Sequence, residues 1–286
     1  MRPARRAFGK RVPPPKADGA FRAATLNVHY IWGRRATGPW SVGDWEARAP
    51  SLAAAVAATD ADLIAFQEME TFSGGNSDET NLARDYLLER FPSYEAAAIG
   101  DWREFPSTQP IFYRPETLTL RDEGWFFFSD SPDEIYSRTF DGSYPAFASW
   151  AEFETPSGAR FRAINVHLDA GSGENRLRSA ELIADRIASF PEGVPALLLG
   201  DLNARAGSRT AGILENAGLT FAPVPGATFH FDHGINLFGA IDHIATGPGL
   251  RLAAGPVVLR ERFEGDWPSD HYPVVADITA RAAANR

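Results

Sequence analysis

The stretch WPSDHYPVV, residues Trp267–Val275, lies near the end of the chain and guides the interpretation of the rest. Its Ser-Asp-His part runs into a Tyr-Pro-Val-Val part that is typical of a β-strand. Asp270 and His271 therefore lie side by side where a loop enters a strand. Three residues alone are a weak signal, so the remaining sequence decides whether they belong to a site.

Five other apolar, β-like runs also end in polar or acidic residues. They are Leu26-Asn27, Ile64-Ala65-Phe66-Gln67-Glu68, Asn165-Val166-His167-Leu168-Asp169, Leu199-Gly200-Asp201-Leu202-Asn203 and Ile241-Asp242-His243-Ile244. Six strand ends that each deliver Asn, Glu, His or Asp predict one shared site for a metal ion and a phosphate group.

The composition narrows the protein class. A chain of 286 residues with 44% hydrophobic residues is long enough to bury a substantial core. The absence of cysteine excludes disulfides and thiolate metal sites. The formal net charge of −9 opposes generic binding to polyanions, although a local basic patch can still bind them. No apolar run approaches the ~18 residues that a membrane span needs.

The N-terminus begins with a basic segment. Residues 4–10 resemble a twin-arginine export signal, but the Pro-rich residues 11–19 follow instead of an apolar stretch. We therefore expect residues 1–19 to be a disordered, basic, Pro-rich leader and the protein to be cytoplasmic. No linker or repeat follows, so we expect a single catalytic domain over residues 20–281 and a flexible tail over residues 282–286.

Hydrophobic periodicity predicts alternating strands and helices. The predicted helices span residues 45–59, 81–91 and 174–190. The predicted strands span residues 21–29, 62–66, 110–114, 118–128, 146–154, 160–167, 195–200, 240–246, 250–259 and 272–278. This order predicts two packed sheets covered by helices, with the polar strand ends at one edge.

Glu68 and Asn27 each come at the end of an apolar strand. A carboxylate and an amide oxygen form the hard-oxygen set that suits Mg²⁺ or Mn²⁺. Mg²⁺ keeps several waters, so few protein ligands are enough. The alternative is a surface glutamate and a turn asparagine.

Asp201 and Asn203 share one side of an extended chain after a wholly apolar strand. Asp201 can deprotonate or orient a water molecule, and Asn203 can donate to a phosphoryl oxygen. The alternative is an Asx-turn.

His167 and His271 can divide transition-state stabilisation and protonation of the leaving group between them. A catalytic histidine needs a partner that fixes its tautomer, and Asp242 is the expected partner of His271. The alternative is that both histidines are structural.

Taken in order, these motifs resemble the endonuclease/exonuclease/phosphatase superfamily, which has the fold of pancreatic deoxyribonuclease. The stretches Pro110–Arg114 and Gly124–Ser129 are similar to the "PIFY" and "GTFWLS" strands of a bacterial branch. The resemblance implies an α/β fold, a four-layer α/β/β/α sandwich of two mixed, mainly antiparallel sheets.

The resemblance also implies roles for the site residues. It implies Glu68 as a metal ligand with Asn27 nearby, and Asp270 as a further acid of the metal site. It implies Asp201 and Asn203 at the attacking water and the phosphate. It implies that the histidines at 167 and 271 flank the phosphate, with Asp242 behind the second.

The sequence departs from that branch at two positions. Ser107 stands where the branch commonly has a glutamate that supports the first histidine. Ala146 stands where an arginine commonly precedes an "ATW" strand. Both changes leave the hydrolytic core intact and bear on the substrate.

The leading hypothesis is a phosphoesterase that uses Mg²⁺, with Mn²⁺ as a substitute, to hydrolyse a small or lipid-like phosphodiester by in-line attack of water. One alternative is a nuclease acting on DNA or RNA, which makes nucleic acid a candidate partner. Another is a non-catalytic binding protein on the same scaffold. The sequence does not predict an oligomeric state.

Overall fold

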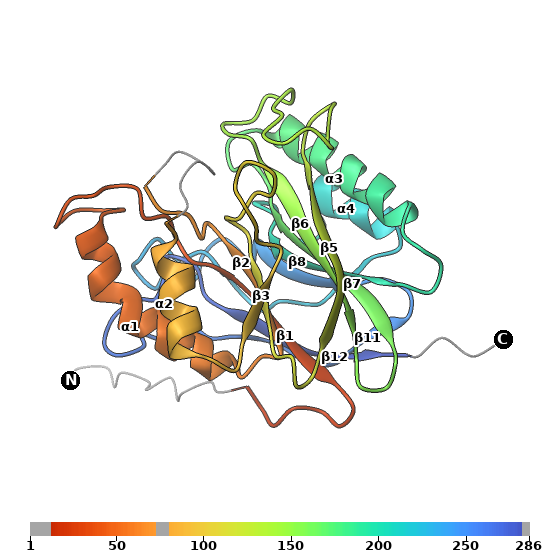
Figure 1. Ribbon diagram of the computed structural model, residues 1–286, viewed down its shortest axis with the longest axis horizontal. Coiled ribbons are helices and arrows are strands. Elements are labelled where there is room, and N and C mark those ends of the chain that lie inside the picture. Colours follow the sequence, from red (N-terminus) through yellow and green to blue (C-terminus); the bar gives the residue numbers. More distant parts are fainter. Residues whose placement is uncertain (1–12, 73–79, 282–286) are drawn as a thin grey trace, which may run out of the picture.

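The computed structural model describes residues 13–72 and 80–281, and these form two six-stranded sheets packed face to face (Figure 1). The first sheet has the strand order β11-β12-β1-β2-β4-β3. Its strands are β1 (Phe21–Asn27), β2 (Leu63–Gln67), β3 (Glu95–Ala97), β4 (Ile111–Tyr113), β11 (Leu250–Val258) and β12 (Val274–Ala280). Only the β1–β2 pair is parallel among the pairs of this sheet in the described residues.

The second sheet has the order β5-β6-β7-β8-β10-β9. Its strands are β5 (Thr119–Phe127), β6 (Phe147–Glu154), β7 (Arg160–His167), β8 (Ala196–Asp201), β9 (Thr220–Phe221) and β10 (Asp242–Thr246). The β7–β8 pair is parallel, and its described neighbours are antiparallel. Both sheets are therefore mixed and mainly antiparallel, as the resemblance implied.

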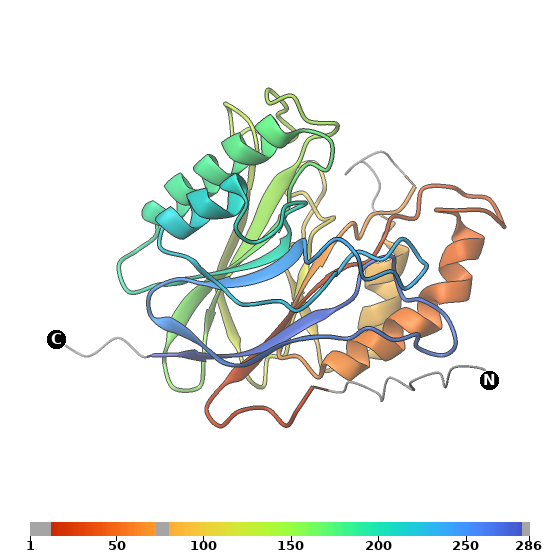
Figure 2. The ribbon, with the colours of Figure 1, turned by 180° about the vertical axis from the view of Figure 1, so that it is seen from behind.

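Two pairs of helices form the outer layers of the molecule. Helices α1 (Val42–Thr59) and α2 (Leu82–Arg90) pack on the first sheet, and α3 (Gly173–Ala188) and α4 (Arg209–Asn216) pack on the second (Figure 2). The side chain of Ser41 caps α1 and that of Ser172 caps α3, each accepting from a backbone N–H of the first turn. The four-layer α/β/β/α sandwich is confirmed.

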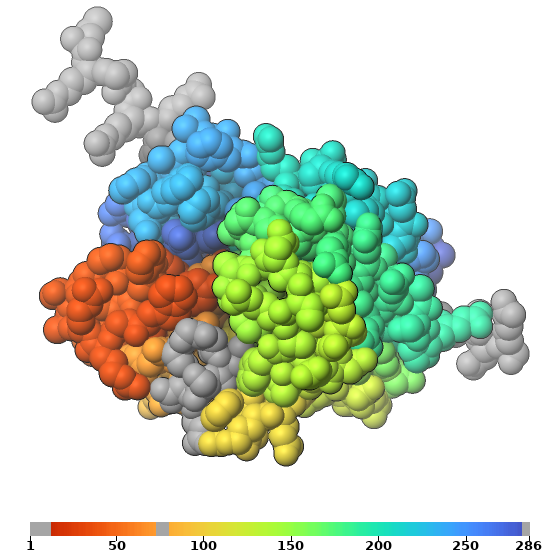
Figure 3. Space-filling view, turned by 90° about the horizontal axis from the view of Figure 1, so that it is seen from above, coloured from red at the N-terminus to blue at the C-terminus, as the bar shows by residue number. Residues whose placement is uncertain are grey.

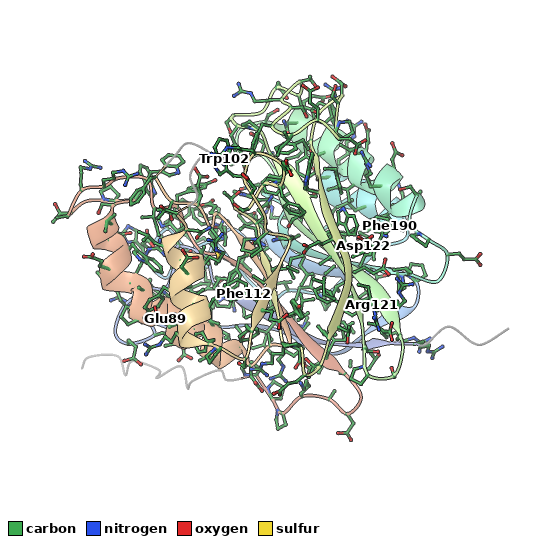
Figure 4. The ribbon with its side chains drawn as sticks, in the orientation of Figure 1. Glu89, Trp102, Phe112, Arg121, Asp122 and Phe190 are labelled. Atoms are coloured by element: carbon green, nitrogen blue, oxygen red, sulfur yellow. The ribbon has the colours of Figure 1, made fainter. Side chains whose placement is uncertain are left out.

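Three apolar clusters hold these layers together. The central cluster lies between the sheets and includes the stacked rings of Phe21 and Phe161, whose centroids are 4.5 Å apart. The second cluster joins the first sheet to α1 and α2 and includes Phe112, which Figure 4 labels. The third joins the second sheet to α3 and α4. Strands β2 and β8 are covered on both faces, which explains their continuous apolar sequences.

Polar side chains also cross between the two sheets. Gln67 at the end of β2 donates to the side-chain oxygen of Asn165 in β7 over 2.7 Å. Asn165 in turn donates to the backbone oxygen of Phe66 over 2.8 Å. Since these groups are buried, each unmade bond would be costly, and the pair fixes the relative position of the sheets directly beneath the polar strand ends.

The structure corrects some boundaries that the sequence predicted. The short strands β3 and β9 and helix α4 were not expected, because two to eight residues carry too little periodicity. Part of the expected leader, residues 1–12, lies outside the described residues. Within residues 13–19, Lys16 pairs with the carboxylate of Asp62 at 2.7 Å, and the N–H of Ala17 donates to Asp277. These contacts tie residues 13–19 to the domain, contrary to the expected boundary at residue 20.

No helix in the described part of the chain is both long enough and apolar enough to cross a membrane.

Candidate active site

The sheet topology brings the polar strand ends to one edge of the sandwich. In the parallel pairs, Asn27 of β1 lies opposite Gln67, and His167 of β7 lies opposite Asp201. Strand β10 runs antiparallel to β8, so its first residue, Asp242, also lies opposite Asp201. Strand β12 runs antiparallel to β1, so the loop before it ends at the same edge. Figure 3 looks down on this end of the molecule.

A cavity of about 580 Å³ opens at this edge. It is lined by Tyr30, Trp32, Glu68, Glu70, Ser143, Tyr144, His167, Ala170, Asp201, Asn203, Phe229, Ile241, Asp270 and His271. Six of the eight residues that the sequence selected are among them. The other two, Asn27 and Asp242, are buried directly behind the lining residues.

Glu68 enters the cavity because the chain turns sharply after β2. Its φ of 55° lies in the left-handed region, which is uncommon for a residue with a side chain. Such strain is found where surrounding structure imposes it, often at functional sites. The side-chain N–H of Asn27 donates to Glu68 over 2.9 Å and lies 3.4 Å from Asp201. The oxygen of the Asn27 amide accepts from the N–H of His29, so Asn27 orients the two carboxylates through its nitrogen.

Three of the four carboxyl groups that line the cavity, those of Glu68, Asp201 and Asp270, differ in the direction or cause of their pKa shifts. Burial, together with the charge of Asp270, raises the pKa of Glu68 to about 8. Burial and the nearby Asp242 carboxylate also raise the pKa of Asp201 above its usual range. Burial alone would raise the pKa of Asp270, but the imidazoles of His271 and His29 reverse this and lower it. Close carboxylates that resist ionisation mark a place where a bound cation would be favourable.

His271 is held by the predicted partner. Its Nδ1 atom lies 2.8 Å from a carboxylate oxygen of Asp242, and its Nε2 atom lies 3.8 Å from Asp201. Burial alone would lower the pKa of His271, but Asp242, together with Asp201 and Asp270, raises it well above the ordinary value. His271 is therefore a cation that points into the cavity.

His167 has a different partner. Its Nδ1 atom lies 3.2 Å from the hydroxyl of Tyr144, and its Nε2 atom lies 3.7 Å from both Glu68 and Asp201. Burial and the charge of His271 lower the pKa of His167 to about 4. This imidazole is therefore neutral near pH 7. The phenol therefore makes a contact with the first histidine of the kind that the resemblance assigns to a glutamate, where this chain has Ser107.

Asn203 lies at the cavity, but its side chain is already partly used. Its side-chain nitrogen donates to the backbone oxygen of Leu168 over 2.8 Å, and its backbone N–H donates to Asp201 over 2.8 Å. The second bond is the Asx-turn that the sequence left open as an alternative. Gly200 begins this turn at a point where a Cβ atom would lie 1.9 Å from the backbone oxygen of Val166. A glycine is therefore required for β8 to pass β7.

Two buried side chains fix the loops around the cavity. Arg48 of α1 donates to the backbone oxygens of Val28 and His29, after β1, and of Pro268, before the Ser-Asp-His motif. Asp169 accepts four hydrogen bonds, two of them from Ser143, the residue before the tyrosine that contacts His167. Both side chains position catalytic candidates without touching the cavity.

Two different sets of residues at the cavity are candidates for holding a cation. The predicted set is Glu68 with Asp270, supported by Asn27. In addition, Asp201, Asp242 and His271 each offer an atom within 4.8 Å of the others. We give more weight to the predicted set, because the bond between Asp242 and His271 already occupies one ligand atom of each. Carboxylate oxygens at a cavity fit a divalent cation such as Mg²⁺.

The sequence did not reveal every residue of the cavity. Tyr144, Tyr30 and Phe229 lie in loops with no periodic pattern, and Glu70 follows the predicted metal ligand by two residues. A Tyr-Pro pair before an apolar strand gave no sign of a contact with His167. The spacing between Glu68 and Glu70 was the one signal that could have indicated a second acid at this edge.

Known proteins share this architecture. An endonuclease/exonuclease/phosphatase family protein from Bacteroides thetaiotaomicron is 23% identical, covers 91% of this chain and 97% of its own, and has a TM-score of 0.73. The mannosyl-6-phosphatase Bt3783 of the same organism is 23% identical over 91% of this chain and 99% of its own, with a TM-score of 0.71. TDP2 of D. rerio, complexed with single-strand DNA product, is 15% identical over 92% of this chain and 100% of its own, with a TM-score of 0.65.

At these identities the solved structures establish a shared fold. No curated protein matches the sequence significantly. The model of the Endonuclease/Exonuclease/phosphatase family, however, matches residues 24–271, which begin within β1 and end at the histidine of the Ser-Asp-His motif. The chain therefore belongs to the endonuclease/exonuclease/phosphatase family.

Proposed function

We propose that the protein is a divalent-metal-dependent hydrolase of a phosphodiester with a small or lipid-like organic group. The observation that carries the proposal is a cavity in which buried carboxylates lie between two imidazoles whose Nε2 atoms face the same Asp201 oxygen, at 3.7 and 3.8 Å. Such a cavity can hold a phosphate group between nitrogen donors on two sides and acidic groups on its floor.

The charge of the cavity favours a diester over a monoester. None of its described lining residues is lysine or arginine. A phosphodiester carries one negative charge, whereas a monoester near pH 7 carries almost two. The cationic His271 and one bound metal ion therefore match a diester better.

The side chains have distinct roles in this proposal. Asp201 orients the attacking water and accepts its proton, because its carboxylate faces both histidines. His271 stabilises negative charge on the phosphoryl group as a cation. His167, which is neutral, donates a hydrogen bond to a phosphoryl or leaving oxygen. Asn203 supports the phosphate through the part of its amide not bonded to the backbone.

Glu68 and Asp270 would hold the metal ion, with Asn27 orienting Glu68. Mg²⁺ or Mn²⁺ bound there would supply positive charge that offsets the charge developing on the phosphate. The ion would also favour the ionised form of Glu68, whose pKa is raised in the metal-free protein.

A nuclease is the second candidate. It is favoured by the likeness to D. rerio TDP2, whose structure contains a single-strand DNA product, and by the aromatic rings at the cavity, on which bases can stack. Against it stand the net charge of −9 and the absence of lysine and arginine among the described lining residues.

A panel of phosphoesters tests the proposal. Hydrolysis of bis(p-nitrophenyl) phosphate with Mg²⁺ or Mn²⁺, its loss with EDTA, and slower hydrolysis of p-nitrophenyl phosphate are expected. Glu68→Gln should reduce metal affinity while leaving the fold intact. Faster cleavage of duplex or single-stranded DNA at ~0.15 M salt than of any small diester would replace the proposal with the nuclease. Metal-independent turnover would contradict it.

A further inference from the structure

Large apolar side chains are exposed in only two loops of the described chain. They are Trp32 and Trp40 in the loop after β1, and Phe231, Leu237 and Phe238 in the loop before β10. The exposed fractions range from 44% for Phe231 to 75% for Leu237. Exposed apolar groups are ordinary when scattered, but their concentration in two loops beside a cavity indicates a binding surface.

Both loops continue the wall of the cavity outward. On the first side, Tyr30 and Trp32 line the cavity and stack at 4.8 Å, and Trp40 follows at 6.0 Å from Trp32. We call these three residues the first lip. In Figure 3 their loop is the orange segment at this end of the molecule.

On the second side, the ring of Phe229 lines the cavity and lies 4.9 Å from that of His271. Phe231 follows at 4.1 Å, and Phe238 lies 5.8 Å from Phe231. We call Phe229, Phe231, Leu237 and Phe238 the second lip, and the two lips together the apolar rim. Each lip therefore leads from the phosphate site to the surface.

The backbone holds the rim in an uncommon conformation. Trp40 has a φ of 56° and Phe231 a φ of 55°, both in the left-handed region. A bulky residue rarely adopts this region, because its Cβ atom crowds the backbone. The surrounding fold therefore keeps these two rings at the mouth of the cavity at a conformational cost.

The shape of the rim separates two kinds of apolar ligand. A flat base or aryl ring is bound best between parallel rings. Within the rim, Tyr30 and Trp32 are inclined by 28° and stack on each other at 4.8 Å, whereas Trp32 and Trp40 are inclined by 51°, Phe229 and Phe231 by 51°, and Phe231 and Phe238 by 68°. The most exposed member, Leu237, is aliphatic. Such an uneven, partly aliphatic surface suits a flexible hydrocarbon chain, which can follow its contour.

We infer that the apolar rim binds the hydrocarbon chain of an amphiphilic phosphodiester whose phosphate lies between the two histidines. This inference rests on the proposed function and names its substrate class. The chain would leave the cavity along one or both lips. The net charge of −9 opposes binding to an anionic surface, which favours a ligand whose negative charge lies at the phosphate alone or that is zwitterionic.

A homologous series of p-nitrophenyl alkyl phosphates tests the inference, used as monomers with methyl, butyl and octyl groups. Each methylene that becomes fully buried can raise affinity by about fourfold, so partial burial along the rim should raise kcat/KM at least tenfold from methyl to octyl. Binding is measured separately, by tryptophan fluorescence in the presence of Ca²⁺ or Mg²⁺, so that an inactive protein is still informative.

The variants are Trp40→Asn on the first lip and Leu237→Ser/Phe238→Ser on the second. None of these positions lines the cavity, and asparagine tolerates the left-handed backbone of Trp40. Both variants should flatten the dependence on chain length while leaving turnover of the methyl ester unchanged. The matched control, His233→Ser, lies exposed in the second loop and removes no apolar side chain, so it should retain the dependence.

The outcomes are distinct. If no diester is hydrolysed but the octyl ester binds more tightly through the rim, the proposed function fails and the inference stands. Equal binding and turnover of the methyl and octyl esters would overturn the inference while leaving the hydrolase intact. A chain-length dependence that survives both variants would also overturn it. Tighter rim-dependent binding of p-nitrophenyl thymidine phosphate than of the octyl ester would replace the chain with a stacked ring.

Discussion

His271 and His167 enter the same cavity from opposite sheets, and both point Nε2 at the same oxygen of Asp201. They differ in what holds Nδ1. Asp242 holds the first and favours its cationic form, whereas the hydroxyl of Tyr144 holds the second, whose pKa is lowered by burial and by the charge of His271. Two histidines in similar positions can therefore differ in charge. The carboxylate partner of His271 fixes both the charge and the orientation of the ring, whereas the phenol partner of His167 fixes only the orientation.

The neutral imidazole of His167 is expected to have a preferred tautomer. Carboxylate oxygens of Glu68 and Asp201 face Nε2 of His167, each at 3.7 Å. We expect these oxygens to favour a proton on Nε2, with the Tyr144 hydroxyl donating to the unprotonated Nδ1. His167 can therefore donate one hydrogen bond to a phosphate but supplies no positive charge.

The largest loss of activity is expected at Asp201, which both imidazoles face. Asp201→Asn removes the carboxylate that both imidazoles face and the proposed acceptor of the water proton. We expect kcat for bis(p-nitrophenyl) phosphate to fall by about 10⁴-fold, the upper end for loss of a positioned acid–base group. Steady-state kinetics with saturating Mg²⁺ measures this. A loss smaller than that from either histidine variant would show that the sides do not converge on Asp201.

The two histidines should differ when each is removed. His271→Ala deletes a cation and should lower kcat by about 10³-fold, whereas His167→Ala deletes a neutral donor and should lower it by about 10²-fold. Metal affinity, measured by calorimetry, should stay near the wild-type value in His271→Ala. Equal losses of kcat in both variants would contradict the proposed difference in charge between the two histidines.

Removing a partner should lower kcat less than removing the histidine that it holds. Asp242→Asn should lower kcat by about 10²-fold, because it disturbs both the charge and the tautomer of His271. Tyr144→Phe removes one neutral hydrogen bond, worth about 1 kcal/mol, and should lower kcat about fivefold.

Double variants provide the control for the partners. Asp242→Asn/His271→Ala should be little worse than His271→Ala alone, and Tyr144→Phe/His167→Ala little worse than His167→Ala. Fully multiplicative losses would mean that the partner acts independently of its histidine.

The sequence was sufficient to predict the sandwich and to select eight residues that the structure brings to one edge, because apolar strands that end in polar residues are a local pattern. The orientation of the Asn27 amide was less accessible, because its nitrogen contacts the carboxylates while its oxygen accepts from His29. Tyr144 could not be predicted, since its place depends on hydrogen bonds from Ser143 to the distant Asp169. The rim was missed because exposure is a tertiary property, and Trp32 or Phe238 alone carries no motif.

The smallest expected effect is on how the free energy of unfolding depends on pH. In the metal-free protein the folded state retains a proton on Glu68 up to pH about 8, whereas an unfolded glutamate loses it near 4.5. The folded state therefore binds more protons, and stability should fall as pH rises toward 8, by at most ~1.4 kcal/mol per pH unit for this group. The raised pKa of His271 acts in the same direction above about 6.5.

Urea unfolding with EDTA between pH 6.5 and 8 measures this slope. Glu68→Gln should reduce the slope, since it removes one retained proton and leaves those of Asp201 and His271, and saturating Mg²⁺ should reduce it in the wild type. An unchanged slope in Glu68→Gln would show that Glu68 is ionised in the metal-free fold.

Imidazole ¹⁵N NMR of the metal-free protein tests the difference between the histidines most directly. The six histidines can be labelled together, and His167→Gln and His271→Gln assign the two signals. Near pH 7 we predict an imidazolium for His271, with both nitrogens protonated, and a neutral ring for His167, with its proton on Nε2. Two neutral rings at pH 7, or two rings that titrate together near 6.5, would contradict the account.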